Sequence, residues 1–200
     1  MPVIIRHSSI ESSDSGTCHI SPLLRPGNIQ NYQVELDLIS IPESMSHQII
    51  LDQTAVGWLQ ILSGSGVARD ENLTQDHIAY LPLGVNDEFR ATEGKTKILI
   101  ARIPEARKFD KNIANMPKDL VSVDWTREPV LQSEHDERKR VYMATPTLVG
   151  TRAFKGEMIT YPPGASAPEH HHVGAEHFQY VISGQGTAIL DGKAVRLDVG

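Results

Sequence analysis

The chain has 200 residues, of which 40% are hydrophobic, so it is long enough for one large domain or two small ones with a buried core. Its formal net charge of −6 argues against nucleic acid or an anionic membrane as the main partner. No apolar run approaches the roughly 20 residues that cross a bilayer, and the single cysteine, Cys18, excludes a disulfide within the chain. We therefore expect a cytoplasmic protein whose partner is a small molecule, with no membrane and no nucleic acid involved.

The first thirty residues, which are rich in Ser, Pro and Gly, are expected to form an N-terminal arm. Residues 31–104 change to short runs with β-type alternation, separated by turn residues. Many short strands with regular turns are typical of a β-sandwich or barrel. The strands predicted in this part cover residues 33–39, 48–51, 56–62, 77–81 and 96–103.

Residues 105–140 interrupt this pattern with prolines and many charges, and we interpret them as a linker between two domains. A short helix over residues 105–116 is one hypothesis for that stretch. The dipeptide Asp191-Gly192 predicts a tight type I′ hairpin turn. Strand-like runs resume within residues 141–200, at 157–161, 177–183, 186–190 and 193–197.

A short motif occurs twice, about 120 residues apart. Residues 58–66 and 178–186 both begin with an aromatic residue, continue with strand-forming residues and an aliphatic residue, and end in Ser-Gly-x-Gly. Two copies of one β-module in a single chain are the simplest interpretation.

Four of the nine histidines fall within eight residues: His170, His171, His172 and His177. Neutral imidazole is the commonest protein ligand for transition metals. On a strand, His170 and His172 would project to the same face, whereas His171 would project to the other and is not expected to bind the metal. Glu169 is interpreted as a surface charge, with the orienting of a ligand as the alternative.

This segment resembles the first conserved motif of the cupin superfamily. The matching positions are Gly164, then five residues, then His170-x-His172. Four residues, an acid-or-His position, six residues and Gly184 follow. The resemblance implies an all-β chain of two cupin-type barrels, each a double-stranded β-helix or jelly roll, which together make a bicupin.

In the cupin pattern the fourth motif position usually holds a glutamate. Counting back from Gly184 places it on His177, whereas three residues after the second histidine selects Glu176. Strand alternation puts His177 and Gln179 on one face and Glu176 on the other, so the orientation of this strand decides the choice. The expected metal ligands are His170, His172 and His177, with Glu176 as the alternative to His177.

The first copy carries the resemblance more weakly, through Pro82-x-Gly84, which is similar to the second cupin motif. Its positions equivalent to the three expected ligands are Ile50, Asp52 and Gly57, and Asp87 stands where the second motif places a histidine. Ile and Gly offer no ligand atoms, so residues 31–104 are expected to form a degenerate cupin domain without metal ligands.

The second copy stops at Gly200, at a point equivalent to about residue 75 of the first copy. Its last strands, and the further histidine that the second cupin motif usually supplies, are expected beyond Gly200. Residues 141–200 are therefore predicted to be an incomplete metal-binding cupin domain, with the C-terminal barrel truncated at Gly200.

Two or three histidines leave coordination positions open around one divalent transition metal, with Fe(II) favoured and Zn, Mn, Ni or Cu as alternatives. The resemblance implies first a non-haem iron dioxygenase that acts on a small organic acid or diketone-like substrate. A metal-dependent lyase, isomerase or hydrolase stays open, as does a non-catalytic binding or storage protein. Gln179 and Tyr161 are candidate substrate contacts, and we expect a homodimer.

Overall fold

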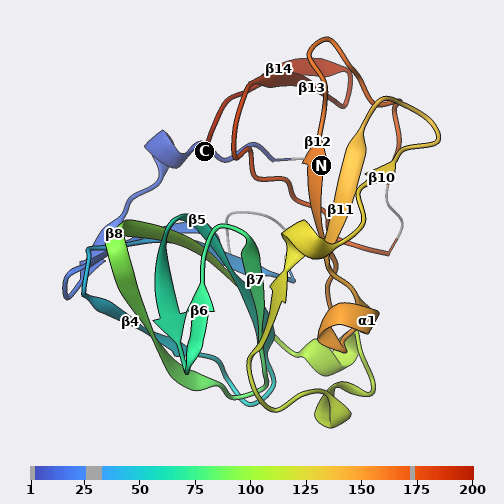
Figure 1. The fold of residues 1–200 in the computed structure, drawn as a ribbon. Coiled ribbons are helices and arrows are strands. Elements are labelled where there is room, and N and C mark those ends of the chain that lie inside the picture. The colour runs from blue at the N-terminus through green and yellow to red at the C-terminus, as the bar shows by residue number, and fades with distance from the viewer. Residues whose placement is uncertain (1–2, 26–32, 172–173) are drawn as a thin grey trace.

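The computed structural model describes residues 3–25, 33–171 and 174–200. The chain is almost entirely β-structure, with one short α-helix, α1 (Pro146–Val149), as Figure 1 shows. The all-β prediction is confirmed. None of the helices in the described ranges has the length and apolar character that a membrane span requires.

The N-terminal part of the chain forms a nine-stranded antiparallel sheet that curls into a barrel (Figure 1). Along the sheet the strands follow the order β1-β2-β3-β8-β5-β7-β9, while β4 pairs with β8 and β6 with β5. The bounds are β1 (Ser13–Ser15), β2 (Cys18–Leu24), β3 (Glu35–Ile41), β4 (Ser46–Ile50), β5 (Val56–Ala68), β6 (Glu71–Leu73), β7 (His77–Leu81), β8 (Asn86–Ile103) and β9 (Val121–Asp124).

The two longest strands, β5 and β8, close this barrel because each takes part in both of its layers. Residues 96–102 of β8 pair with β3, and residues 86–90 pair with β4. The register between β5 and β8 shifts repeatedly between Ile61 and Gly66, where Gly64 has a φ of +78°. Such bulges bend a strand sharply, so the Ser-Gly-x-Gly motif marks the corner of the barrel.

The interior of the N-terminal barrel is packed with aliphatic and aromatic side chains. Along β5, Leu59 and Ile61 point inward, as strand alternation requires. Each such side chain contributes roughly 1.5–3 kcal/mol when it is fully buried. The largest members of this core are Ile39, Ile41, Ile49, Leu59, Ile61, Leu73, Leu81, Phe89 and Ile98.

The N-terminal arm is more ordered than its composition predicted. Residues 18–24 form β2, which pairs with β3 and extends the sheet. Cys18, Leu23 and Leu24 of this strand are buried, so packing against the barrel outweighs the turn-forming composition.

The predicted linker also contributes to the barrel, because β9 pairs with β7. In place of the single helix hypothesised for residues 105–116, two 3-10 turns form, Ala106–Lys108 and Ile113–Asn115. Ala106 and Ile113 are buried, which anchors each turn to the barrel. A third 3-10 turn, Trp125–Arg127, follows β9.

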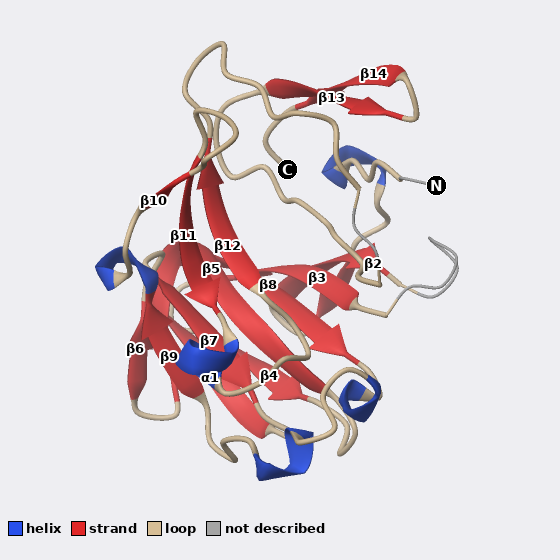
Figure 2. Ribbon diagram, turned by 90° about the vertical axis from the view of Figure 1, so that its right-hand side faces the viewer, coloured by secondary structure: helices blue, strands red, loops and turns tan. Residues whose placement is uncertain are grey.

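The C-terminal part of the chain has two smaller sheets. One consists of β10 (Leu131–Gln132), β11 (Lys139–Ala144) and β12 (Gly156–Thr160), and the other is the hairpin of β13 (Gly186–Leu190) and β14 (Lys193–Leu197). Figure 2 shows the hairpin separated from the main barrel. Asp191 and Gly192 have φ angles of 49° and 74°, which confirms the predicted type I′ turn.

The strand predicted over residues 177–183 does not form. A strand needs a neighbour that accepts and donates its backbone hydrogen bonds, and this segment pairs with no strand of the described chain. One backbone bond, from Gly200 N to Val181 O at 3.2 Å, ties it to the C-terminal end instead.

Candidate functional site

The histidine cluster lies in the long connection between β12 and β13. The described residues of this connection form neither strand nor helix, and His170, His171 and His177 are exposed. The two motif glycines, Gly164 and Gly184, have φ angles of 81° and 80°. Both therefore occupy the left-handed region that favours glycine, which explains why the motif has glycine at each end.

A hydrogen bond fixes the tautomer of the first predicted ligand, His170. Its Nδ1 lies 2.9 Å from the carbonyl oxygen of Pro168. A carbonyl oxygen only accepts, so Nδ1 carries the proton and Nε2 carries the lone pair. Metal-binding histidines are commonly oriented in this way by a bond from the other ring nitrogen.

Among the described residues, the remaining predicted ligands are not brought to one point. Glu176 accepts a hydrogen bond from the backbone N–H of Gln33 at 2.6 Å, which ties its carboxylate to the start of the N-terminal barrel. His172 lies outside the described residues. Within residues 3–25, 33–171 and 174–200, no three His, Cys, Asp or Glu side chains gather closely enough to hold one ion.

The residue types of this cluster nevertheless suit a divalent transition metal. Imidazole nitrogens and one carboxylate are the donors that Fe, Mn, Zn and Ni share. The exposed imidazoles of His170 and His177 are accessible to an ion from solvent. The donor chemistry therefore fits a metal, whereas the described geometry does not assemble the site.

Alternate side chains after His177 pack onto the N-terminal barrel. The rings of Phe178 and Trp58 stack, with centroids 6.3 Å apart and planes at 16°. Tyr180 packs against the cluster that contains Leu23 and Leu24, and this burial raises the pKa of its hydroxyl. These aromatic residues form the contact between the two modules, and they are not directed into a C-terminal barrel.

The two candidate substrate contacts lie in different surroundings. Tyr161 is 40% exposed, and the guanidinium of Arg138 lies 5.9 Å from the centre of its ring. Arg138 also pairs with Asp136 at 2.7 Å, so a fixed cation holds this ring. Gln179 is exposed on the connection.

The equivalent positions of the N-terminal barrel do not face a common point. Ile50 is 59% exposed on the outer side of β4, and Asp52 is exposed in the following turn. Gly57 is buried, and a Cβ there would overlap the carbonyl of Ala101. Close approach of β5 and β8 therefore accounts for the glycine.

Asp87, the position of the expected second-motif histidine, has a structural partner. It accepts a hydrogen bond from Nε of Arg69, which also donates to Asp119 at 2.6 Å. These two carboxylates raise the pKa of the Arg69 guanidinium. Asp87 thus joins the turn after β5 to the start of β8.

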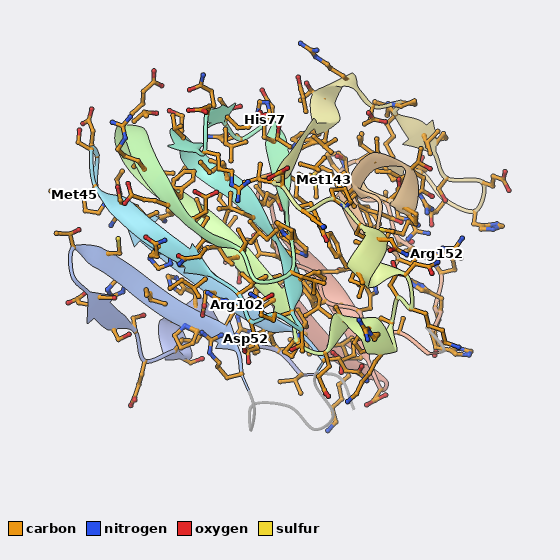
Figure 3. All side chains as sticks on the ribbon, turned by 90° about the horizontal axis from the view of Figure 1, so that it is seen from below. Met45, Asp52, His77, Arg102, Met143 and Arg152 are labelled. Carbon is orange, nitrogen blue, oxygen red and sulfur yellow. The ribbon has the colours of Figure 1, made fainter. Side chains whose placement is uncertain are left out.

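Sequence reasoning missed a buried ionic cluster at one end of this barrel. The side chain of Asp37 is 4% exposed and accepts hydrogen bonds from both Arg25 and Arg102 (Arg102 is labelled in Figure 3). The half-buried His47 lies close enough to Arg102 for that charge to lower its pKa further, after the larger effect of burial. In the predicted strand over residues 33–39, polar and apolar residues alternate, and Asp37 is one of the polar ones. This pattern normally indicates an exposed side chain.

Sequence reasoning also missed a cavity of about 440 Å³ between the two modules. Its wall on one side is β5, including Gln60 and Leu62, and on the other side β11 and β12, including Val141 and Met158. No sequence motif marks it, because residues from several segments far apart in the sequence combine to form it.

Residues 157–200, which contain the histidine cluster, match the family model described as a cupin domain. No curated protein is similar enough in sequence to count as a match. Among solved structures, protein YlbA from E. coli aligns with a TM-score of 0.66 at 15% identity, covering 98% of this chain and 82% of YlbA.

Two further solved structures share the fold over less of their length. The putative glyoxylate-induced protein from Pseudomonas aeruginosa has a TM-score of 0.54 at 13% identity, covering 68% of this chain and 54% of its own. A mutant of Bacillus subtilis oxalate decarboxylase has a TM-score of 0.54 at 9% identity, covering 76% of this chain and 56% of its own. This chain therefore spans about half the length of these two proteins, and identities this low indicate a shared fold alone.

Proposed function

The chain is a cupin by its fold, and on that premise we propose that it is a metal-dependent enzyme. Its proposed ligands are His170, His172 and His177, which bind one divalent transition metal, with Fe(II) favoured. The observation that carries the proposal is the position of four clustered histidines inside the segment that matches the cupin domain.

The choice of His177 over Glu176 is supported by the repeat. His177 is equivalent to Gly57, which lies on the inward face of β5 together with Leu59 and Ile61. Glu176 would fall on the outward face, where its carboxylate already accepts the hydrogen bond from Gln33. If residues 177–183 paired as the motif predicts, an inward His177 would approach the same point as His170 and His172.

Each residue has a distinct proposed role. The Nδ1–H bond from His170 to the Pro168 carbonyl holds the ring so that Nε2 faces the ion. A divalent ion held by three neutral imidazoles keeps its full positive charge and binds anionic, bidentate substrates. Gln179 shares the predicted face of His177 and would donate a hydrogen bond to a substrate oxygen, and Tyr161 would contact the substrate at the rim.

The substrate class that we propose is a small organic acid or a diketone-like compound, with dioxygen as the co-substrate. Two fold neighbours have names that concern small organic acids, one an oxalate decarboxylase and one a glyoxylate-induced protein. The name of the first also favours a second candidate function, a metal-dependent lyase that cleaves a carbon–carbon bond without dioxygen.

Metal analysis tests the proposal. We expect the chain, purified without chelators, to contain about one divalent ion, and the substitutions His170→Ala and His172→Ala each to reduce its metal affinity by about 10–100-fold or more. The matched control is His135→Ala, because His135 is also exposed but lies outside the cluster. Metal content that is substoichiometric and unchanged in the two cluster variants would overturn the proposal.

Turnover then separates the two reactions. Iron in the protein, with oxygen uptake in the presence of a panel of small organic acids and diketones, supports the dioxygenase. Manganese or zinc in the protein, with product formed under anaerobic conditions, supports the lyase. Binding of the acids without turnover in either atmosphere contradicts both enzymes and leaves a binding protein.

A further inference from the structure

The cavity between the modules has the dimensions of a ligand site and lies apart from the histidine cluster. Its volume of about 440 Å³ falls within the range of roughly 300–1,000 Å³ that is usual for small-molecule sites. Residues of β5 line one side of it, and residues of β11 and β12 line the other side. None of the described histidines lines it.

The walls of the cavity are mainly apolar. Leu62 from the N-terminal barrel faces Val141 and Met158 from the C-terminal sheet, and Ile182 adds a side chain from the connection that carries the histidines. Burying an apolar ligand here would stabilise the complex in proportion to the apolar surface removed from water. The walls therefore favour a ligand with a hydrocarbon body.

A buried amide provides a polar group on one wall. Gln60 is 5% exposed, and its Nε2 donates to Sδ of Met143 at 3.9 Å (Met143 is labelled in Figure 3). A thioether sulfur is a weak acceptor, so this bond satisfies the amide poorly. Buried polar groups without strong partners are destabilising, and an oxygen atom of a ligand would complete the hydrogen bonding of Gln60.

A lysine supplies a cation at the rim of the cavity. Lys139 lies on the same face of β11 as Val141, which lines the cavity together with Met158. Arg140 projects to the opposite face, where it lies 3.9 Å from Glu157, and the one carboxylate among the lining residues belongs to Asp76. Lys139 is thus the cation that a ligand carboxylate would meet.

We propose that this cavity binds a monocarboxylate with an apolar chain, of the size of a medium-chain fatty acid. The chain lies between Leu62, Val141 and Met158, and the carboxylate meets Lys139 at the rim. Gln60 donates to an oxygen of the ligand. The site is independent of the metal site proposed above, so either one can fail without the other.

Octanoate and octanol are the probes, with binding to the full chain measured by isothermal titration calorimetry. We expect octanoate to bind with a dissociation constant below about 1 mM, because its hydrocarbon chain is removed from water in the cavity. We expect octanol to bind about tenfold more weakly, since it lacks the charge that Lys139 recognises.

Two variants test the location of the site. Thr160→Trp fills the cavity from an exposed position at the end of β12 and should abolish octanoate binding. Thr187→Trp is its matched control, because Thr187 is also an exposed strand residue but lies in β13, away from the cavity. Lys139→Ala should weaken octanoate binding by about three- to tenfold and leave octanol unchanged, whereas Lys193→Ala on the exposed hairpin should change neither.

The outcomes separate this site from the metal site. Octanoate binding that persists in His170→Ala and His172→Ala supports a distinct cavity. Equal binding of octanoate and octanol overturns the assignment of a carboxylate ligand. Saturable octanoate binding that Thr160→Trp leaves intact, or no binding at millimolar octanoate, overturns the site itself.

Discussion

Trp58 and Phe178 stack on each other, and they occupy equivalent positions of the internal repeat. Leu62 and Ile182, a second equivalent pair, line the same cavity nearby. Equivalent residues of the repeated motif therefore lie close together, although only the first copy forms a strand.

The first prediction concerns the coupling between these two rings. Trp58→Ala and Phe178→Ala should each destabilise the chain, and the double-mutant cycle should give a coupling energy of about 0.5–1.5 kcal/mol, because stacked aromatic pairs contribute this much beyond burial. Urea unfolding followed by circular dichroism measures the four free energies of unfolding.

A matched control separates stacking from general burial. Phe109 is 39% exposed and Phe178 is 38% exposed, so the two lose similar apolar contact on truncation. Phe109→Ala combined with Trp58→Ala should be additive within about 0.5 kcal/mol. A Trp58–Phe178 coupling no larger than this control value would show that the modules do not associate through the rings.

Strand alternation and turn chemistry predicted much of this fold. Residues 77–81, 186–190 and 193–197 form strands with the predicted bounds, and Asp191-Gly192 forms the predicted turn. These elements depend on the local alternation of polar and apolar residues and on turn residues, which can be read from the sequence. The bend of β5 at Gly64 also follows from the repeated Ser-Gly-x-Gly motif.

Other features depend on distant partners that no local pattern specifies. Residues 177–183 have the alternation of a strand but no neighbouring strand to pair with, so Phe178 and Tyr180 pack on the N-terminal barrel instead. Asp37 occupies one of the alternating polar positions of its strand, which normally indicates exposure. Its side chain is nevertheless enclosed by Arg25 and Arg102. The convergence of the clustered histidines stays a prediction, since His172 lies outside the described residues.

The second prediction concerns the buried carboxylate of Asp37. Asp37→Asn removes the charge that pairs with Arg25 and Arg102 and leaves two partly buried guanidinium groups uncompensated. Breaking a buried ion pair costs about 3–5 kcal/mol, and we expect a value near the lower end because the Arg25 side chain is 31% exposed. Chemical denaturation at neutral pH measures the loss.

The control for Asp37 is a carboxylate at the surface. Oδ1 of Asp14 lies 3.0 Å from Nδ1 of His19, and the aspartate side chain is 81% exposed. Asp14→Asn should reduce stability far less than Asp37→Asn, because solvent screens an exposed carboxylate. Similar losses in the two variants would mean that the Asp37 cluster behaves as a surface pair.

The third prediction is a pH dependence carried by Asp110. Its carboxylate accepts hydrogen bonds from the backbone N–H of Arg152 at 2.8 Å, from Thr151 Oγ1 at 3.0 Å and from the N–H of Asn112 at 3.0 Å. The backbone bond from Arg152 is the largest cause that lowers the pKa of Asp110. Asp110 thereby connects the turns after β8 to the segment between α1 and β12.

A pKa that is lower in the folded state means that this carboxylate stabilises the fold above its ordinary pKa of about 4 and loses that effect as the pH falls below it. Asp110→Asn should therefore cost about 1.5–3 kcal/mol at pH 7, and its difference from the wild type should shrink on acidification below pH of about 4. Asp70→Asn, at an exposed turn, is the control and should leave the pH profile unchanged. A difference between Asp110→Asn and the wild type that is independent of pH would contradict this role.

The fourth prediction separates backbone strain from steric overlap at two glycines. Gly64 and Gly94 have φ angles of +78° and +58°, so alanine at either position adopts a left-handed conformation at a cost of about 1 kcal/mol. A Cβ on Gly94 meets no atom within 4 Å, whereas a Cβ on Gly64 lies 2.9 Å from Cα of Thr96 on the neighbouring strand. Since overpacking adds about 1–3 kcal/mol, Gly64→Ala should lose about 2–4 kcal/mol and Gly94→Ala about 1 kcal/mol in urea unfolding. Equal losses would mean that the corner of the barrel relaxes around the methyl group, and that the close approach of β5 to β8 does not fix the glycine of the repeated motif.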